Sequence, residues 1–243
     1  MSAWLAQTRA EVRMTIRRGE TLLLTIAIPV LLLVFFSLAR VTASPTAHRV
    51  DFIAPGIIAL SVLSTAMVAL SIATGFERSF GVLRRLYVTP LGRRRLIGAK
   101  IAGVLVTEAI QVVVVAAVAV ALGWRPHGGV HGSLLVILVI LLGSMGLAGI
   151  GLGLAGWLRA EVNLAASNGL YLVLLLLSGI VVPVTSLPSV VGRIAVVLPS
   201  GSLAEALHRI LGLGLSPTGG DWASLLVWAL GAPLLAARTF RFD

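Results

Sequence analysis

Six apolar runs, each close to the length that a helix needs to cross a bilayer, constrain what this chain can fold into. A hydrocarbon core about 30 Å thick takes roughly 20 helical residues. The runs cover residues 21–39, 52–74, 101–123, 133–156, 164–184 and 222–237. Their apolar residues are continuous, without the alternation of a barrel strand, which indicates helices. With 58% hydrophobic and 12% charged residues, the sequence predicts an all-α polytopic membrane protein with six transmembrane helices in one domain, residues 1–243.

Basic residues are unevenly divided between the two sides that this arrangement defines. Residues 76–100, between the second and third runs, hold seven of the 19 Lys and Arg residues. In total 14 fall on the side of the two termini and five on the other. Because an excess of Lys and Arg marks the cytoplasmic side, both termini are predicted to be cytoplasmic, in a multi-pass protein of the cell (plasma or inner) membrane. Anionic lipid headgroups are the expected partners of this charge. Nucleic acid is not, because no aromatic and basic platform accompanies the charge.

The N-terminal segment, residues 1–20, is too polar to span but carries an apolar stripe beside a basic one. At 100° per residue the apolar stripe holds Leu5, Val12 and Ile16, and the basic stripe holds Arg9, Arg13 and Arg17. This pattern predicts an amphipathic helix that lies on the inner leaflet. A polar lead-in that only sets the orientation is the alternative.

Residues 185–220, between the fifth and sixth runs, form an apolar but interrupted segment. Its stretch 190–198 is bracketed by Pro188 and Pro199 and is too short to cross the membrane. We expect a hairpin of short re-entrant helices that dips into the outer leaflet and packs against neighbouring spans. A plain interfacial loop is the alternative.

Motifs for catalysis or for an energy source are missing from the sequence. A phosphate-binding loop would end in Lys-Ser or Lys-Thr, whereas the only lysine, Lys100, precedes Ile101. The chain is therefore not expected to be an ATPase or another enzyme. His127 and His131 are separated by two glycines and have no carboxylate nearby in the sequence, so no metal site is predicted.

A few polar residues fall inside the apolar runs. Glu108 lies about seven residues into the third run, and Gln111 shares its face. A buried carboxylate must be protonated, paired or hydrated, so these two residues are candidates for a translocation path or an interface. The alternatives for Glu108 are a salt bridge to a basic residue of the segment 76–100, called the basic segment below, and a role in proton coupling. Ser61, Ser64 and Ser71 form a polar stripe in the second run, which either lines a substrate path or only packs.

The fourth run carries glycines on one face, at intervals of three, four and three residues. They are Gly146, Gly149, Gly153 and Gly156. Small residues let another helix approach closely, so this face is predicted to pack against a helix, either of the same chain or of a second copy.

Two segments carry a family resemblance. ERSFGVLRRLYVTPLGRRRLIGAK, and then SGIVVPVTSLPSVVGRIAVVLPSGSLAEALHRIL, resemble the type-2 ABC transporter permeases, and the compact chain resembles the antibiotic-resistance branch that includes daunorubicin exporters. The matching positions are Glu77, Arg78, Gly81, Leu83, Thr89, Pro90, Leu91 and Lys100, then Ser178, Gly179, Pro183, Leu187, Pro188, Leu198, Pro199 and Glu205.

The resemblance implies the permease subunit of an ATP-driven exporter of lipophilic or amphipathic compounds, such as drugs, antibiotics or lipid-like molecules. Its implied partners are two cytosolic ABC ATPase subunits, which would carry ATP and Mg, and a second permease copy or paralogue; no cofactor is expected in this chain. Within residues 76–100, contact with the ATPase is implied for Glu77, Arg78, Gly81, Leu83, Arg84, Thr89, Pro90 and Leu91. The alternatives are a membrane assembly protein that transports nothing and an ion-coupled transporter.

Overall fold

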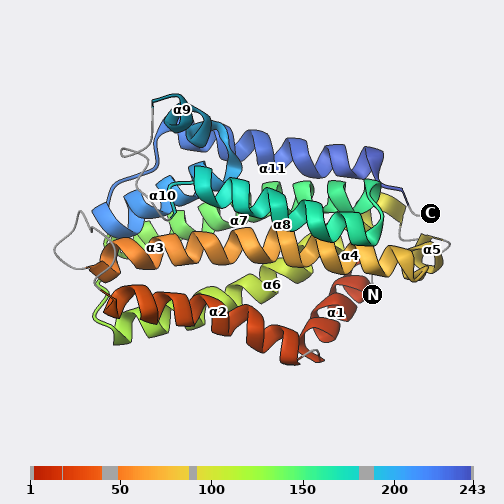
Figure 1. Ribbon diagram of the computed structural model, residues 1–243, viewed down its shortest axis with the longest axis horizontal. Coiled ribbons are helices and arrows are strands. Elements are labelled where there is room, and N and C mark those ends of the chain that lie inside the picture. The colour runs from red at the N-terminus through yellow and green to blue at the C-terminus, as the bar shows by residue number, and fades with distance from the viewer. Residues whose placement is uncertain (1–2, 18, 40–48, 88–91, 181–188, 242–243) are drawn as a thin grey trace.

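The computed structural model describes residues 3–17, 19–39, 49–87, 92–180 and 189–241, and every regular element within these ranges is a helix. The elements are α1 (Ala3–Arg17), α2 (Gly19–Leu38), α3 (Arg49–Val62), the π-helix η1 (Leu63–Ala69), α4 (Leu70–Ser79), α5 (Val82–Tyr87), α6 (Gly92–Ala121), α7 (Gly129–Trp157), α8 (Ala160–Leu177), α9 (Ser189–Val197), α10 (Pro199–Leu213) and α11 (Gly219–Thr239). They form an elongated bundle (Figure 1).

Five of these helical segments are long and apolar enough to cross a membrane, which confirms the predicted all-α polytopic membrane protein. They are Arg49–Ser79, Arg95–Ala121, Gly129–Trp157, Ala160–Leu177 and Gly219–Thr239. The first predicted span lies in α2, whose described apolar part, Thr25–Leu38, is shorter. Six spans therefore remain a prediction.

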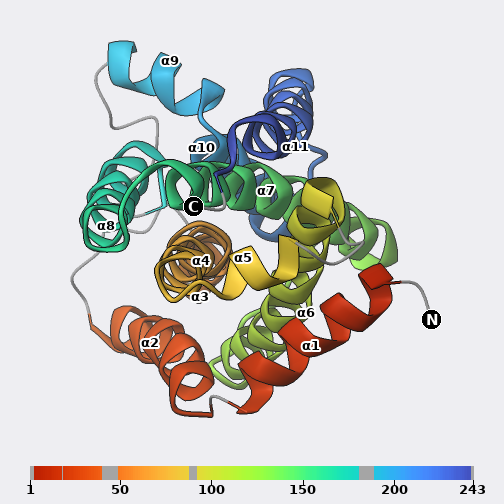
Figure 2. The same ribbon diagram turned by 90° about the vertical axis from the view of Figure 1, so that its right-hand side faces the viewer.

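The central rod, α3, η1 and α4 in one continuous stretch from Arg49 to Ser79, forms the middle of the bundle. Figure 2 looks along the bundle and shows α3 and α4 surrounded by α2, α6, α7 and α8. Of the most apolar window in the rod, 72% is buried, compared with 22–44% in the other four candidate spans. A helix that is apolar on all sides is suited to such a central position.

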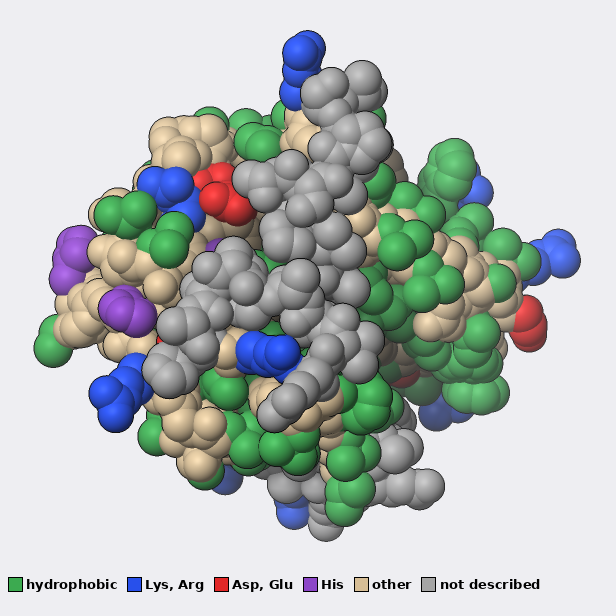
Figure 3. All heavy atoms as spheres, turned by 60° about the vertical axis from the view of Figure 1, so that its left-hand side comes forward, with side chains coloured by type: hydrophobic (Ala, Val, Ile, Leu, Met, Phe, Trp, Pro, Cys, Tyr) green, Lys and Arg blue, Asp and Glu red, His purple; other side chains and the backbone are tan. Residues whose placement is uncertain are grey.

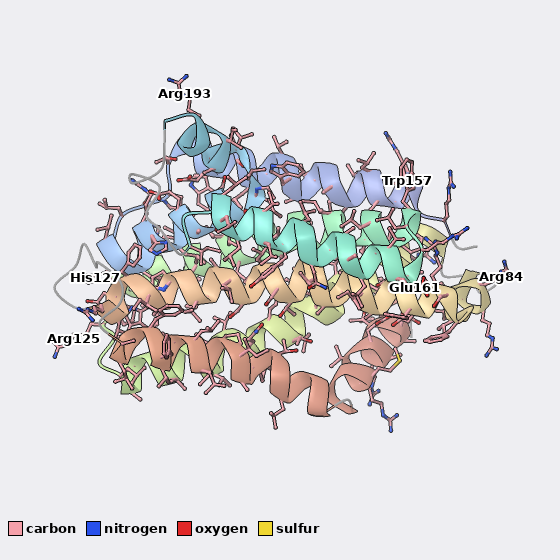
Figure 4. All side chains as sticks on the ribbon, in the orientation of Figure 1. Arg84, Arg125, His127, Trp157, Glu161 and Arg193 are labelled. Atoms are coloured by element: carbon pink, nitrogen blue, oxygen red, sulfur yellow. The ribbon has the colours of Figure 1, made fainter. Side chains whose placement is uncertain are left out.

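The bundle has two ends, which carry different elements of the chain. Arg84, Trp157 and Glu161 lie toward one of them, and Arg125, His127 and Arg193 lie toward the other (Figure 4). The first end, with α1, α5, the α7–α8 junction and the last turn of α11, is called the basic end below; the second, with α9 and α10, is called the hairpin end. Figure 3, turned to bring the hairpin end forward, shows hydrophobic side chains over much of the described surface, with Lys and Arg side chains isolated among them.

Helices extend further into the basic segment than the apolar runs indicate. The predicted second span ends at residue 74, but α4 continues to Ser79, and α6 begins at Gly92 rather than at residue 101. Arginine is a good helix former, so basic residues prolong both helices beyond the apolar stretch. Of the segment 76–100, only residues 80–91 separate α4 from α6, and they contain the short helix α5.

The hairpin consists of two short helices, α9 and α10, that separate at Pro199. Proline occupies the first turn of α10, where its missing N–H costs no hydrogen bond. Leu203, Leu207 and Ile210 of α10 are buried, and α10 packs against both α3 and α7. The imidazole of His208 adds a polar contact, with its ring nitrogens 2.8 Å from the Ala204 carbonyl oxygen and 3.0 Å from that of Phe52. The re-entrant depth of this hairpin remains a prediction.

The glycine face of α7 packs largely against α11 of the same chain. A Cβ at Gly146 would lie 3.0 Å from Trp228, one at Gly149 would lie 2.4 Å from the nitrogen of Pro233, and one at Gly156 would lie 2.6 Å from the Phe240 ring. Gly153 differs, because nothing lies within 4 Å of its Cβ position. Two of the four glycines thus allow close approach of α11, a third accommodates Phe240, which directly follows α11, and the fourth borders open space.

Candidate functional site

A groove opens at mid-length of the central rod, between η1, α2 and α8. Its volume is about 380 Å³. Ile28 and Leu60 contribute apolar surface, whereas Ser64, Asn168 and Tyr171 bring polar groups. Ligand sites typically combine an apolar wall with a few polar groups that orient the ligand. The groove can therefore hold an amphipathic molecule.

The π-helix η1 forms the wall of the groove on the side of the rod. Seven residues, Leu63–Ala69, are in this conformation, which is rare and frequently occurs at functional sites. Thr65 and Thr25, which also line the groove, are both bonded to Gln111: Thr65 Oγ1 donates to Gln111 Oε1 at 3.0 Å, and Gln111 Nε2 donates to the Thr25 carbonyl oxygen at 2.7 Å. Gln111 is fully buried. These two hydrogen bonds connect η1, α6 and α2 across the interior.

The serines predicted as one polar stripe separate in the structure. Ser64 lines the groove. Ser61 Oγ donates to the Ile57 carbonyl oxygen of its own helix at 2.8 Å. Ser71 lies toward the basic end, in contact with α8. A local periodicity shows that these side chains share one face but not which helix that face meets.

Glu108 does not line the groove. Its side chain is buried, and its Oε2 accepts a hydrogen bond from the Ser144 hydroxyl of α7. Its Oε1 has no hydrogen-bond partner among the described residues. The alternative of a salt bridge from Glu108 to the basic residues of the segment 76–100 is wrong for the part of the chain that the structure describes, because there Glu108 is bonded only to Ser144.

A polar clamp fastens α4 to α8 between the groove and the basic end. Ser71 Oγ donates to Asn163 Oδ1, Asn163 Nδ2 donates to the Ser71 carbonyl oxygen, and Ser167 Oγ donates to Ser71 Oγ, each at 2.9 Å. All three residues are fully buried. Asn163 was missed in the sequence because it directly precedes the apolar run 164–184 and resembles a residue of the preceding loop.

At the basic end, Lys100 joins three helices. Its Nζ lies 2.6 Å from Glu77 Oε2 of α4 and 3.3 Å from Glu11 Oε1 of α1. The lysine itself is on α6 and only 3% exposed. A buried ammonium group requires such carboxylate partners. The Glu11–Lys100–Glu77 triad therefore holds the amphipathic helix α1 and the end of the central rod against α6.

The comparison with protein families agrees with this arrangement. Residues 2–211, from α1 into α10, match the sequence model of the family described as ABC-2 type transporter. The chain belongs to the ABC-2 type transporter family. As a membrane domain of this family, it is a permease subunit of an ABC transporter. It has no ATPase motif of its own. Permeases of this family associate in general with ABC ATPase partners. A search among curated proteins found no match.

In this ABC-2 permease, the residues assigned to ATPase coupling divide into anchors and exposed positions. Glu77 is held by Lys100, Arg78 donates to the Ala155 carbonyl oxygen of α7 at 2.7 Å, and the Leu83 side chain is fully buried. Gly81 turns the chain between α4 and α5 with φ of 71°, a conformation that a side chain would strain. Arg84 is exposed. Thr89, Pro90 and Leu91 lie outside the described residues, and contact with an ATPase stays a prediction for the whole set.

The predicted amphipathic helix corresponds to α1 of the permease. It lies across α6 (Figure 2), with which it has extensive contacts. Arg9 and Arg13 are exposed, and Arg17 has no described side chain. No group of three His, Asp or Glu side chains that could hold a metal ion occurs in the described part of the permease.

Proposed function

We propose that this permease moves lipophilic or amphipathic compounds out of the cytoplasm or the inner leaflet, powered by a separate ABC ATPase. The groove between η1, α2 and α8 carries the proposal, because it combines apolar walls with the polar groups of Ser64, Asn168 and Tyr171. A drug, antibiotic or lipid-like molecule presents the same combination of surfaces. The resemblance to daunorubicin exporters supports the same class of cargo.

The coupling path in this proposal is the central rod. Its η1 segment lines the groove, and its α4 segment ends at the α4–α5 turn, where Arg78 and Leu83 anchor the chain. A force on the turn would reach the groove along one continuous helix. Because π-helices are rare overall and frequent at functional sites, we take η1 as the place where the groove changes shape.

The complex we propose contains two ATPase subunits and a second permease copy or paralogue. ATP and Mg would bind to the ATPase subunits. The basic end would face the cytoplasm, since Arg78, Arg84, Arg85 and Arg159 are placed there by α4, α5 and the α7–α8 junction.

The orientation is tested with single cysteines, because the chain has none of its own. Arg84→Cys and Arg125→Cys place a thiol at exposed positions of the basic end and the hairpin end. In intact cells, a membrane-impermeant maleimide is expected to label the thiol at position 125 but to reach the one at position 84 only after the membrane is opened. The reverse pattern would overturn the orientation.

The substitution Ala69→Phe tests the groove. Ala69 is exposed and lines the groove, so the phenyl ring of the variant would occupy it. We expect transport of a lipophilic test drug by the reconstituted complex to fall at least about tenfold, because the ring takes up volume that the drug needs. ATP hydrolysis without drug should persist. Ala223→Phe, at an exposed position of α11, is the matched control and should leave transport unchanged. Equal transport by both variants would exclude the groove as the path, and a permease that binds no ATPase would contradict the proposal as a whole.

A further inference from the structure

A second and larger cavity lies between α7 and α11, the two helices that pack closely through the glycines described above. Its volume is about 860 Å³, more than twice that of the groove. Its lining falls within residues 149–158, at the end of α7, and residues 227–239 of α11. This space is called the α7–α11 cleft below. Because α11 and α2 lie on opposite sides of the central rod (Figure 2), the cleft is separate from the cargo groove.

The cleft stays open where each helix carries a glycine that packs against nothing. A Cβ at Gly153 of α7 or at Gly231 of α11 would have no atom within 4 Å. Trp157 lies one turn from Gly153, and Val227 and Leu235 lie one turn on either side of Gly231, so they share the faces of the glycines. These three large side chains line the cleft and are exposed. The result is a hollow between projecting apolar side chains.

Polar side chains of the cleft gather at the basic end. Arg238 and Thr239, both exposed, lie in the last turn of α11. Trp157, the last residue of α7, lies toward the same end (Figure 4). Farther along, the lining is apolar, and the indole N–H of Trp228 is used by the hairpin, since it donates to the Val197 carbonyl oxygen at 2.8 Å. The cleft is thus an apolar hollow with a basic and aromatic end.

We propose that the α7–α11 cleft binds an anionic phospholipid of the leaflet next to the basic end, with an acyl chain in the hollow and the phosphate at Arg238. A guanidinium group offers a planar pair of donors that matches two phosphate oxygens. Tryptophan is enriched at the level of the headgroups, which is where Trp157 would lie. The inference goes beyond the proposed cargo path, because the lipid would occupy a different side of the bundle.

The length of the cleft corresponds to one leaflet. On α11 its lining extends from Val227 to Thr239, which is about 18 Å at about 1.5 Å per residue. The hydrocarbon of one leaflet is half of a core about 30 Å thick, or about 15 Å. With Arg238 at the headgroup level, the cleft therefore reaches the middle of the bilayer, the depth that an acyl chain spans.

The charge of the lining favours an anionic headgroup over a zwitterionic one. Arg238 is the only charged side chain among the described residues that line the cleft. Basic side chains at the membrane surface attract anionic lipids, whereas the amine of a zwitterionic headgroup would find no carboxylate among the described lining residues. The long arginine side chain can also keep its charge at the headgroup level while its methylene groups cover apolar surface.

A transmembrane helix of a second copy fits the cleft less well than an acyl chain. Helices in membranes approach each other where small residues form a continuous face. Here the exposed side chains of Trp157, Leu234 and Leu235 project beside the two glycines. A helix at least about 10 Å wide would meet these side chains before it reached the glycines, whereas a single methylene chain can pass between them.

The substitution Gly231→Leu in the full-length permease, purified without lipid in detergent, tests the inference. Gly231 is exposed and has open space at its Cβ position, so the variant should fold while its side chain fills the hollow. In a titration with phosphatidylglycerol followed by native mass spectrometry, we expect the first lipid to bind at least about tenfold more weakly than to wild type. Gly169→Leu, at an exposed and equally open position of α8, is the matched control and should bind like wild type.

A second variant tests the position of the headgroup. Arg238→Gln removes the charge but leaves the hollow, so the preference of wild type for phosphatidylglycerol over phosphatidylcholine should disappear, while phosphatidylcholine binds as before. If Gly231→Leu melts below wild type in the absence of lipid, Gly153→Leu, which fills the cleft from α7, supplies the measurement instead.

The contradicting outcomes are distinct from one another. Wild-type affinity for phosphatidylglycerol in both leucine variants would overturn the lipid site. Equal affinity of wild type for phosphatidylglycerol and phosphatidylcholine would show nonspecific lipid contact and would overturn it as well. Loss of a permease dimer in Gly231→Leu, with unchanged lipid binding, would assign the cleft to a second copy. Each measurement uses the permease without its ATPase, so none of these results bears on the proposed transport.

Discussion

The substitution Gly149→Leu is expected to destabilise the permease by about 3 kcal/mol or more, whereas Gly153→Leu on the same face of α7 leaves its stability nearly unchanged. A Cβ at position 149 would lie 2.4 Å from the nitrogen of Pro233 and 2.5 Å from the carbonyl carbon of Ala232. Both are backbone atoms, so α11 as a whole must move away. At position 153 the space is open, and leucine also favours the helix over glycine.

Thermal unfolding of the two purified variants in the same detergent checks this expectation. Gly149→Leu should melt well below wild type, and Gly153→Leu should melt at or slightly above it. The pair is a close control, because both changes add the same side chain to the same helix one turn apart. If the two variants melted together, the packing of α7 on α11 described above would be incorrect.

Replacing the one lysine is expected to have a comparably large effect. Lys100→Met removes the ammonium group that both Glu11 and Glu77 contact, and the side chains of these two residues are only 13% and 19% exposed. Breaking a buried ion pair by removing one partner costs about 3–5 kcal/mol. We expect a lower melting temperature and faster proteolysis of α1, since the triad attaches α1 to α6.

The same triad provides its own compensating variant. Lys100→Met combined with Glu11→Gln and Glu77→Gln removes the two carboxylate charges together with the ammonium charge, and a buried ion pair replaced by uncharged residues is often close to neutral in stability. Most of the lost melting temperature should therefore return in the triple variant. If Lys100→Met alone melts like wild type, the triad does not stabilise the junction of α1, α4 and α6.

The positions of the membrane helices were largely predictable from local sequence. Continuous apolar stretches gave the cores of the central rod, α6, α7, α8 and α11, and the prolines at 188 and 199 indicated the two short helices of the hairpin. The end of α4 and the start of α6 in the basic segment were predicted less well, since the arginines at 78 and 93–95 do not interrupt a helix that leaves the membrane. The mid-length π-helix η1 was not predicted, because its sequence, LSTAMVA, has no pattern that distinguishes it from α-helix.

The candidate sites were predictable only in part. The sequence singled out Ser64 and Gln111, which do border or support the groove, but it grouped them with Ser61, Ser71 and Glu108, which do not line it. Asn163, Trp157 and Arg238 were not predicted as site residues at all. Each acquires its neighbours from a helix dozens of residues away, and no spacing along the chain encodes such a contact.

The sequence by itself determined that this polypeptide is a helical membrane protein without an ATPase motif, because both conclusions depend on composition and on short contiguous patterns. Only the tertiary structure decided that Lys100 pairs with Glu11 and Glu77, that the glycines of α7 meet α11, and that Trp157 and Arg238 line one cleft. The physical reason is that a helix periodicity specifies a face, whereas the partner of that face depends on how the bundle brings distant segments together.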